Sequence, residues 1–187
     1  KMEKQYYYAY SQYLKDKYGE KVYKLPVNLP VTCPIKKMKG LSFLAEAGTG
    51  FEASDSSVSV FEQLAASRTK VEKRYHAHKF IAYFQNYTNT FLPLDRLLGY
   101  MEEASKVEDI VEISISTRPD CIRQDYLEAF YEFSSRTGIE VSIELGLQTA
   151  NYHTLQMMTG DMVLLEFIDA VLRIKDILVF NLYPCDS

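Results

Sequence analysis

The sequence is poor in cysteine and contains no tryptophan. Its three cysteines, Cys33, Cys121 and Cys185, are odd in number and far apart, which argues against a disulfide framework. No two of them have the two-residue spacing of a zinc-binding motif, so a self-contained zinc site has no support. We interpret Cys121 and Cys185 as ordinary buried thiols.

Long apolar runs are also lacking, and none could span a bilayer. The segment 1–10 is polar and rich in tyrosine, without the apolar centre of a signal peptide. We therefore expect a cytoplasmic protein that does not bind membranes. Hydrophobic residues make up 47% of the chain and charged residues 25%, the balance of a soluble globular protein. The length favours one domain over 1–187, with an N-terminal helix within 1–20.

An excess of basic charge is absent, because the formal net charge is −4. A nucleic-acid partner would therefore have to use a local patch. The candidate patch is Arg68 to Lys79, which reads RTKVEKRYHAHK; the alternative is a solvated helix face. His76 and His78 within it are spaced for different faces of a helix, so a shared metal site is not expected.

What the sequence does contain is an alternation of apolar strands and amphipathic helices. Such alternation predicts a parallel sheet, either an open doubly wound sheet or part of a barrel. The expected strands cover 21–31, 80–84, 109–116, 139–145 and 177–182. The expected helices cover 6–18, from Ser56 or Ser57 to about 78, 93–105 with Pro93 in the first position, 123–137, 151–158 and 164–176.

Polar residues follow most of the expected strands, at the end where parallel sheets bind ligands. The segments after the first four strands are 32–34, 85–90, 116–120 and 146–149, and a fifth lies at 183–185. Loops of a purely structural sheet need not be so rich in hydrogen-bonding groups. The sequence therefore predicts a ligand site built from several strand ends.

Five segments, in order along the chain, resemble a bacterial family of radical S-adenosylmethionine (radical SAM) enzymes of the Elp3-like, YhcC/YtqA type. They read VNLPVTCP, FLAEAGTGF, HKFIAYFQNYTNTFLPLD, VEISISTRPDCI and IELGLQT. The resemblance implies an α/β fold, a partial (β/α)6 TIM-barrel-like radical SAM core with parallel strands, whose C-terminal part is missing from this chain.

The resemblance also implies a chemistry. A [4Fe–4S] cluster held by three cysteines would leave one iron open for S-adenosyl-L-methionine (SAM). An electron from a donor such as flavodoxin or ferredoxin would cleave SAM to methionine and a 5′-deoxyadenosyl radical. The implied substrate is RNA, at the wobble uridine of tRNA. The implied cofactor-binding residues are Gln85, Asn86, Thr88, Ser116, Arg118 and Gln148, and the implied metal ligand is Cys33.

Three of the interpretations leave alternatives open. Arg118 belongs to the STRPD segment, where it either pairs with Asp120 to fix the turn or contacts substrate. Glu112 and Glu144 fall on expected strands, and Glu144 either binds SAM or a substrate amine inside a barrel or is a structural carboxylate. The tyrosines of 6–10 either belong to a helix that closes the barrel bottom or stack on RNA bases.

The pattern departs from the family at the cluster. Leu41 and Leu44 occupy the positions of the other two cluster cysteines, and leucine has no lone pair for iron. Three explanations remain open: loss of catalysis from an active ancestor, a fragment with altered loops, or residues at these loops that differ from those the gene encodes. The alternative function is a non-catalytic protein of this fold that keeps SAM or partner binding. A plain α/β enzyme binding phosphate ranks last, because no Gly-rich phosphate loop is present.

Overall fold

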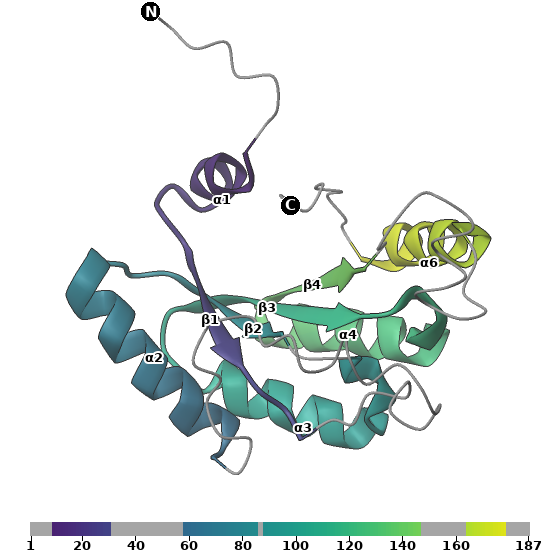
Figure 1. The fold of residues 1–187 in the computed structure, drawn as a ribbon, viewed down its shortest axis with the longest axis horizontal. Coiled ribbons are helices and arrows are strands. Elements are labelled where there is room, and N and C mark those ends of the chain that lie inside the picture. The colour runs from purple at the N-terminus through teal and green to yellow at the C-terminus, as the bar shows by residue number, and fades with distance from the viewer. Residues whose placement is uncertain (1–8, 31–57, 86–87, 147–163, 179–187) are drawn as a thin grey trace, which may run out of the picture.

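The computed structural model describes residues 9–30, 58–85, 88–146 and 164–178 (Figure 1). Within these residues four strands form one parallel sheet in the order β1-β2-β3-β4. The strands are β1 (Tyr23–Val27), β2 (Phe80–Phe84), β3 (Ile110–Thr117) and β4 (Glu140–Leu145). The helices are α1 (Tyr10–Tyr18), α2 (Val60–Tyr75), α3 (Leu94–Ser105), α4 (Gln124–Thr137) and α6 (Leu164–Ile177), with short 3-10 turns η3 (Asn89–Phe91) and η4 (Pro119–Cys121). The prediction of an α/β fold with parallel strands is confirmed.

The sheet has one apolar face and one polar face. Helices α2, α3 and α4 cover the apolar face (Figure 1), where strand residues such as Phe84 and Ile115 are fully buried against Leu97 and Phe130. Successive strand residues point to opposite faces, so the residues between these buried ones point the other way. The polar face, as we call it below, carries Lys24, Tyr83, Glu112, Ser114, Ser116, Glu140, Ser142 and Glu144.

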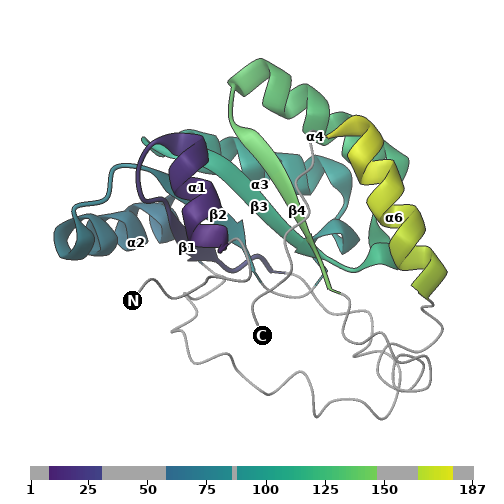
Figure 2. The ribbon, with the colours of Figure 1, turned by 90° about the horizontal axis from the view of Figure 1, so that it is seen from above.

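Helix α1 lies on the polar side of the sheet, opposite α2, α3 and α4 (Figures 1 and 2). It ends at Gly19, whose φ of 80° is the left-handed conformation that glycine adopts without steric cost. The Lys79 ammonium, just before β2, donates a 2.7 Å hydrogen bond to the Tyr18 carbonyl. Since this contact lies at the amino ends of the strands, α1 covers that end of the polar face. The interpretation of this segment as a helix at the barrel bottom fits α1; residues 6–8 lie outside the described residues.

Several element boundaries differ from the prediction. Helix α2 is capped by Ser59, not by Ser56 or Ser57, because Ser59 and Glu62 form a reciprocal capping box. It ends at Tyr75, since His76 has a left-handed φ of 51°. Pro93 is the N-cap of α3 rather than its first helical residue. Ile177, expected to begin a fifth strand, is the last residue of α6.

The other predicted elements agree closely with the structure. Strand β2 has the predicted bounds, and β3 and β4 each differ by about one residue from expectation. Helix α4 stops at Gly138, as predicted, with a φ of 73°. Pro26 lies inside β1, which is tolerated because β1 is an edge strand of the described sheet. The predicted helix 151–158 and the rest of the predicted fifth strand lie outside the described residues.

Candidate functional site

The structure brings four predicted site residues to one edge of the sheet. Gln85 and Thr88 follow β2, and Ser116 and Arg118 lie at the end of β3, its parallel neighbour. The carboxyl ends of parallel strands meet at this edge, which we call the carboxyl edge. Predicted site residues Cys33, Asn86 and Gln148 lie outside the described residues.

Hydrogen bonds tie the tips of β1 and β2 together at the carboxyl edge. The Gln85 amide donates a 3.3 Å hydrogen bond to the side-chain oxygen of Asn28, which directly follows β1. Asn28 is 5% exposed, and its backbone forms a pair of hydrogen bonds of 2.9 and 3.1 Å with the Gln63 side chain of α2. Gln63 thus holds Asn28 in place, and Asn28 in turn positions the Gln85 side chain.

The predicted residues after β2 and β3 have different surroundings. Thr88 is 1% exposed, and its backbone carbonyl accepts a 3.0 Å hydrogen bond from Phe91 in the turn η3. Ser116 is half-buried, and its hydroxyl donates a 3.1 Å hydrogen bond to the Tyr83 phenol on β2. The side chains of Ser116 and Tyr83 therefore meet on the polar face just below the carboxyl edge.

Arg118 and Asp120 form a two-pronged ion pair, with both N–O distances at 2.9 Å. Burial by itself raises the pKa of the Asp120 carboxyl, but the hydrogen bonds and charge of Arg118 outweigh it and lower that pKa below 3.8. The pair holds the 3-10 turn η4 in place, which is the structural alternative for these residues. A contact of Arg118 with a ligand stays a prediction.

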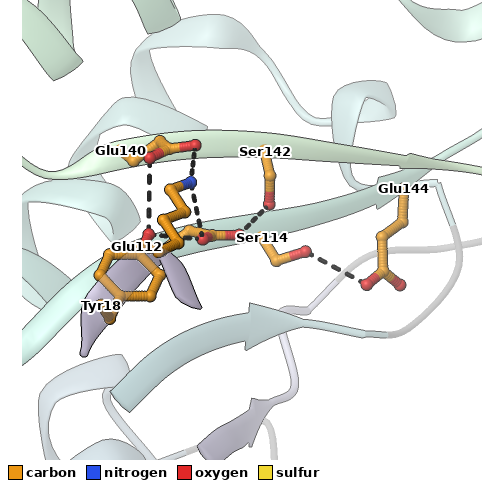
Figure 3. Close-up of polar contacts among 7 residues, drawn as sticks. Tyr18, Glu112, Ser114, Glu140, Ser142 and Glu144 are labelled. Carbon is orange, nitrogen blue, oxygen red and sulfur yellow. Dashed lines mark hydrogen bonds and ion pairs between the residues drawn. The ribbon is translucent and has the colours of Figure 1, made fainter. Parts of the chain in front are cut away.

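The polar face is organised in rows across neighbouring strands. Glu112 pairs in register with Glu140, Ser114 with Ser142, and Ser116 with Glu144. Side chains in successive rows contact one another (Figure 3): Ser142 donates a 2.6 Å hydrogen bond to Glu112, and Ser114 a 3.4 Å one to Glu144. Barrels usually fill this face with branched apolar side chains, so a face of carboxylates and hydroxyls is suited to a polar ligand.

Glu144 is engaged inside the protein. It forms an ion pair with Lys24 of β1 across the face. The Lys24 ammonium also lies 4.4 Å from the ring centre of Tyr83 and 5.1 Å from that of Tyr10 in α1. The Glu144 carboxylate therefore points to the polar face, as binding of a ligand inside a barrel would require. On that face its charge is balanced by Lys24, which is the role of a structural carboxylate.

Helix α1 supplies the partners of the other two carboxylates. Lys17 forms an ion pair with Glu140 and lies 3.9 Å from Glu112, which is 2% exposed. Tyr18 donates a 2.8 Å hydrogen bond to Glu112 and a 3.4 Å one to Glu140 (Figure 3).

These contacts shift the pKa values of three α1 residues. Burial lowers the pKa of Lys17, but Glu140, Tyr13 and Glu112 outweigh it, and the net shift is upward. Burial and the charge of Glu112 raise the pKa of both Tyr10 and Tyr18, so these phenols stay neutral.

No three histidine, cysteine or carboxylate side chains within the described residues are grouped to hold a metal ion. His76 and His78 are both exposed beyond the end of α2. Cys121 is partly exposed, not buried as predicted, and its thiol lies 3.7 Å from the Asp120 carboxylate. Cys185 lies outside the described residues.

The basic patch predicted for RNA lies at the other end of the sheet. Its residue Tyr75 stacks at 5.0 Å on Tyr23, the first residue of β1, which places this part of α2 at the amino ends of the strands. Arg68 is engaged by Asp109 at 2.6 Å, and Lys79 by Glu20 at 3.4 Å. The patch therefore does not border the carboxyl edge.

Sequence reasoning missed several residues that build this site: Asn28, Lys24, Tyr83, Asn89, Thr90 and Glu140. One signal was present in the spacing. Glu112, Ser114 and Ser116 alternate with isoleucines on β3, and Glu140, Ser142 and Glu144 repeat the pattern on β4. Read together, these alternations predict a polar face shared by two neighbouring strands.

Comparisons with known proteins identify relatives of similar sequence. The chain is 32% identical to the Bacillus subtilis protein YtqA over 152 residues, which are 79% of this chain and 47% of YtqA. It is 36% identical to Escherichia coli YhcC over 146 residues, which are 76% of this chain and 46% of YhcC. No protein-family model matches. The chain thus spans about half the length of these relatives.

A solved structure shows the same fold. The archaeal Elp3 of Methanocaldococcus infernus superimposes with a TM-score of 0.52 over 80% of this chain and 34% of the Elp3 chain, at 15% identity. The α/β fold with its parallel sheet therefore resembles that of Elp3. Among the described helices, none is both long and apolar enough to cross a membrane.

Proposed function

We propose that this chain binds S-adenosyl-L-methionine at the carboxyl edge of its sheet, as a radical SAM-like core. The observation that carries the proposal is the meeting of Gln85, Ser116 and Arg118 at the tips of adjacent parallel strands. Open parallel sheets bind ligands at this edge. The similarity to YhcC, YtqA and Elp3 supports the same assignment.

The chemistry of the edge suits such a ligand. SAM carries an amino group, a carboxylate and a ribose with two hydroxyls, so it needs both hydrogen-bond donors and acceptors. Gln85 supplies an amide, Ser116 a hydroxyl and Arg118 the positive charge that suits a carboxylate. Below the edge, the Tyr83 phenol lies beside Ser116 on the polar face and adds another hydroxyl.

The residues of this sequence do not fit a [4Fe–4S] cluster. Of the three positions that would supply thiolates only Cys33 is a cysteine, and Leu41 and Leu44 offer no donor atom. One thiolate does not hold four irons. The favoured function is therefore SAM binding without its reductive cleavage.

Titration with SAM tests the proposal, with methionine and ATP as control ligands. Since no iron would chelate the amino acid moiety of SAM, we expect weak binding. NMR chemical-shift changes at Gln85 and Ser116 should report this binding. ATP shares the adenosine but lacks the amino acid moiety, and methionine lacks the adenosine, so each should change these signals less than SAM does. Unchanged spectra with SAM, or equal changes with ATP, would defeat the assignment.

A second candidate is the catalytic one, which the ordered set of family motifs favours. In it a cluster would supply the electron, taken from flavodoxin or ferredoxin, that cleaves SAM to methionine and a 5′-deoxyadenosyl radical, and the substrate would be a tRNA wobble uridine. Anaerobic reconstitution with iron and sulfide separates the candidates. A brown protein that cleaves SAM supports catalysis, whereas a colourless one supports binding alone.

Restoring the thiols sharpens this second test. The variant Leu41→Cys/Leu44→Cys should gain a cluster if the rest of the scaffold is intact. Sequencing the gene across residues 33 to 44 shows whether the thiols are encoded.

The basic patch lies away from the proposed SAM site. If tRNA binds to the chain, we expect charge reversal at Lys70, Lys73 and Arg74 to leave SAM binding at the carboxyl edge unchanged, because these residues lie toward the far end of α2.

A further inference from the structure

The turn η3 is fastened to β3 by two neighbouring side chains that sequence reasoning did not single out. Asn89 is fully buried, and its amide nitrogen donates hydrogen bonds to two strand-end carbonyls, Phe84 at 2.7 Å and Ser116 at 2.9 Å. Phe84 ends β2, and Ser116 lies near the end of β3. One amide group therefore joins the tips of two adjacent strands.

Thr90 adds a second connection from the same turn. Its hydroxyl lies 2.5 Å from the Thr117 hydroxyl at the end of β3 and donates a 2.9 Å hydrogen bond to the Cys121 carbonyl in η4. Because Thr90 has one proton to donate, the Thr117 hydroxyl must be the donor in the contact between them. Both protons are thus committed, and the segment after β2 is fixed to the segment after β3.

The side-chain geometry of Asn89 indicates that the connection between η3 and β3 carries a cost in free energy. Its side-chain oxygen is buried and has no hydrogen-bond partner among the described residues. Buried polar atoms are rarely left unpaired, and each exception calls for an explanation. In the observed orientation the amide nitrogen bonds both carbonyls, so among the described residues the nitrogen is satisfied at the expense of the oxygen.

We infer that Asn89 and Thr90 are positioning residues for the SAM site, an inference that rests on the proposed function. Gln85 and Thr88 lie on the segment after β2, and Ser116 and Arg118 lie at the end of β3. The Asn89–Thr90 connection sets the distance between these two groups without contacting the ligand itself. Loss of the connection should therefore weaken binding even where the protein stays folded.

The variant Thr90→Val tests this inference, because valine keeps the shape of threonine and removes only its hydroxyl. The matched control is Thr137→Val at the opposite end of the sheet, where the Thr137 hydroxyl bonds Phe133 and accepts from Ile139 before β4. Thr90→Ser restores the hydroxyl. SAM affinity is measured by NMR titration and folding by thermal unfolding of the same samples.

We expect Thr90→Val to weaken SAM binding about tenfold, by analogy with the lower end of what outer-shell substitutions cost at metal sites. Thr137→Val should lower the melting temperature similarly and leave the affinity unchanged, and Thr90→Ser should bind like the unaltered chain. If Thr90→Val does not fold, Thr117→Val serves instead, because it removes the hydroxyl–hydroxyl contact but keeps the bond to Cys121.

The outcomes separate this inference from the proposed function. Normal SAM binding by Thr90→Val, with only its stability reduced, would overturn the positioning role and leave SAM binding standing. An unaltered chain that does not bind SAM would overturn the proposed function and the positioning role together. Equal weakening by Thr137→Val would show that general loss of stability is the cause.

Discussion

The Tyr18 hydroxyl donates a 2.8 Å hydrogen bond to the Glu112 carboxylate, joining α1 to the most deeply buried charge of the polar face. Helix α1 contributes only one buried residue, Leu14. It is therefore held to the sheet mainly through polar contacts, which are Tyr18 with Glu112, Lys17 with Glu140 and the Tyr18 carbonyl with Lys79.

Removing the Tyr18 hydroxyl should loosen α1 without unfolding the sheet. A hydrogen bond to a charged group contributes about 1.5–3 kcal/mol, so Tyr18→Phe should lower the local opening free energy of α1 by an amount in that range. Native-state hydrogen exchange over residues 10–18 measures it. Tyr131→Phe is the control, since Tyr131 is 55% exposed on α4. Equal exchange in both variants would contradict the role of this hydrogen bond.

The apolar face should carry most of the stability. Phe130 of α4 is fully buried in the core, and its neighbour Tyr131 points to solvent. Phe130→Ala should lower the free energy of unfolding by about 3–5 kcal/mol through lost contacts and a cavity. Tyr131→Ala should change it by roughly 0.5 kcal/mol or less. Urea unfolding of the two variants provides the comparison, and similar midpoints would refute the placement of α4.

The fold could be predicted from the sequence because its signals are local. The apolar runs of β2 and β3 and the stop at Gly138 each depend on a few neighbouring residues. The start of α2 was misplaced because three serines precede it within four positions, and only Ser59 has a glutamate three residues later. The capping-box rule, applied to each serine, would have selected the correct one.

The candidate site was less accessible to sequence reasoning. The polar edge followed from topology, since strand-end residues of a parallel sheet must meet. The partners within the site did not follow, because they depend on strand register and helix placement. Lys24 and Glu144 are 120 positions apart, and only the sheet order makes them neighbours. Thr88 is buried rather than open at the edge because η3 turns inward after β2.

Acid should reveal the ion pair between Asp120 and Arg118. The pKa of Asp120 is lowered in the folded protein, so its contribution to stability is present above pH 3.8 and is lost as the pH falls through the lower folded value. We expect the chain to be more stable than its Asp120→Asn variant at pH 6, and this difference to shrink below about pH 4. Thermal unfolding across this range is the measurement. A constant difference would show that the charge of Asp120 does not matter.

The capping box of α2 provides a further test of local structure. Ser59→Ala removes the hydroxyl that accepts a 3.3 Å hydrogen bond from the Glu62 backbone, and should cost about 1 kcal/mol. Ser67→Ala within the same helix removes no cap, and alanine is the better helix former there. Chemical denaturation should therefore separate the two serine variants. A loss in both would point to a general sensitivity of α2.

Pro26 has a consequence for how the sheet can grow. Tyr23 donates to Lys79 and Val27 accepts from Gln85, so the odd-numbered residues of β1 bond to β2 and the backbone of Pro26 faces outward. A strand arriving at that outer edge would meet a nitrogen without a hydrogen. Pro26 therefore disfavours the pairing of an extra strand with β1, including the edge-to-edge pairing that starts aggregation. In the described sheet, β4 is the side on which extension meets no such obstacle.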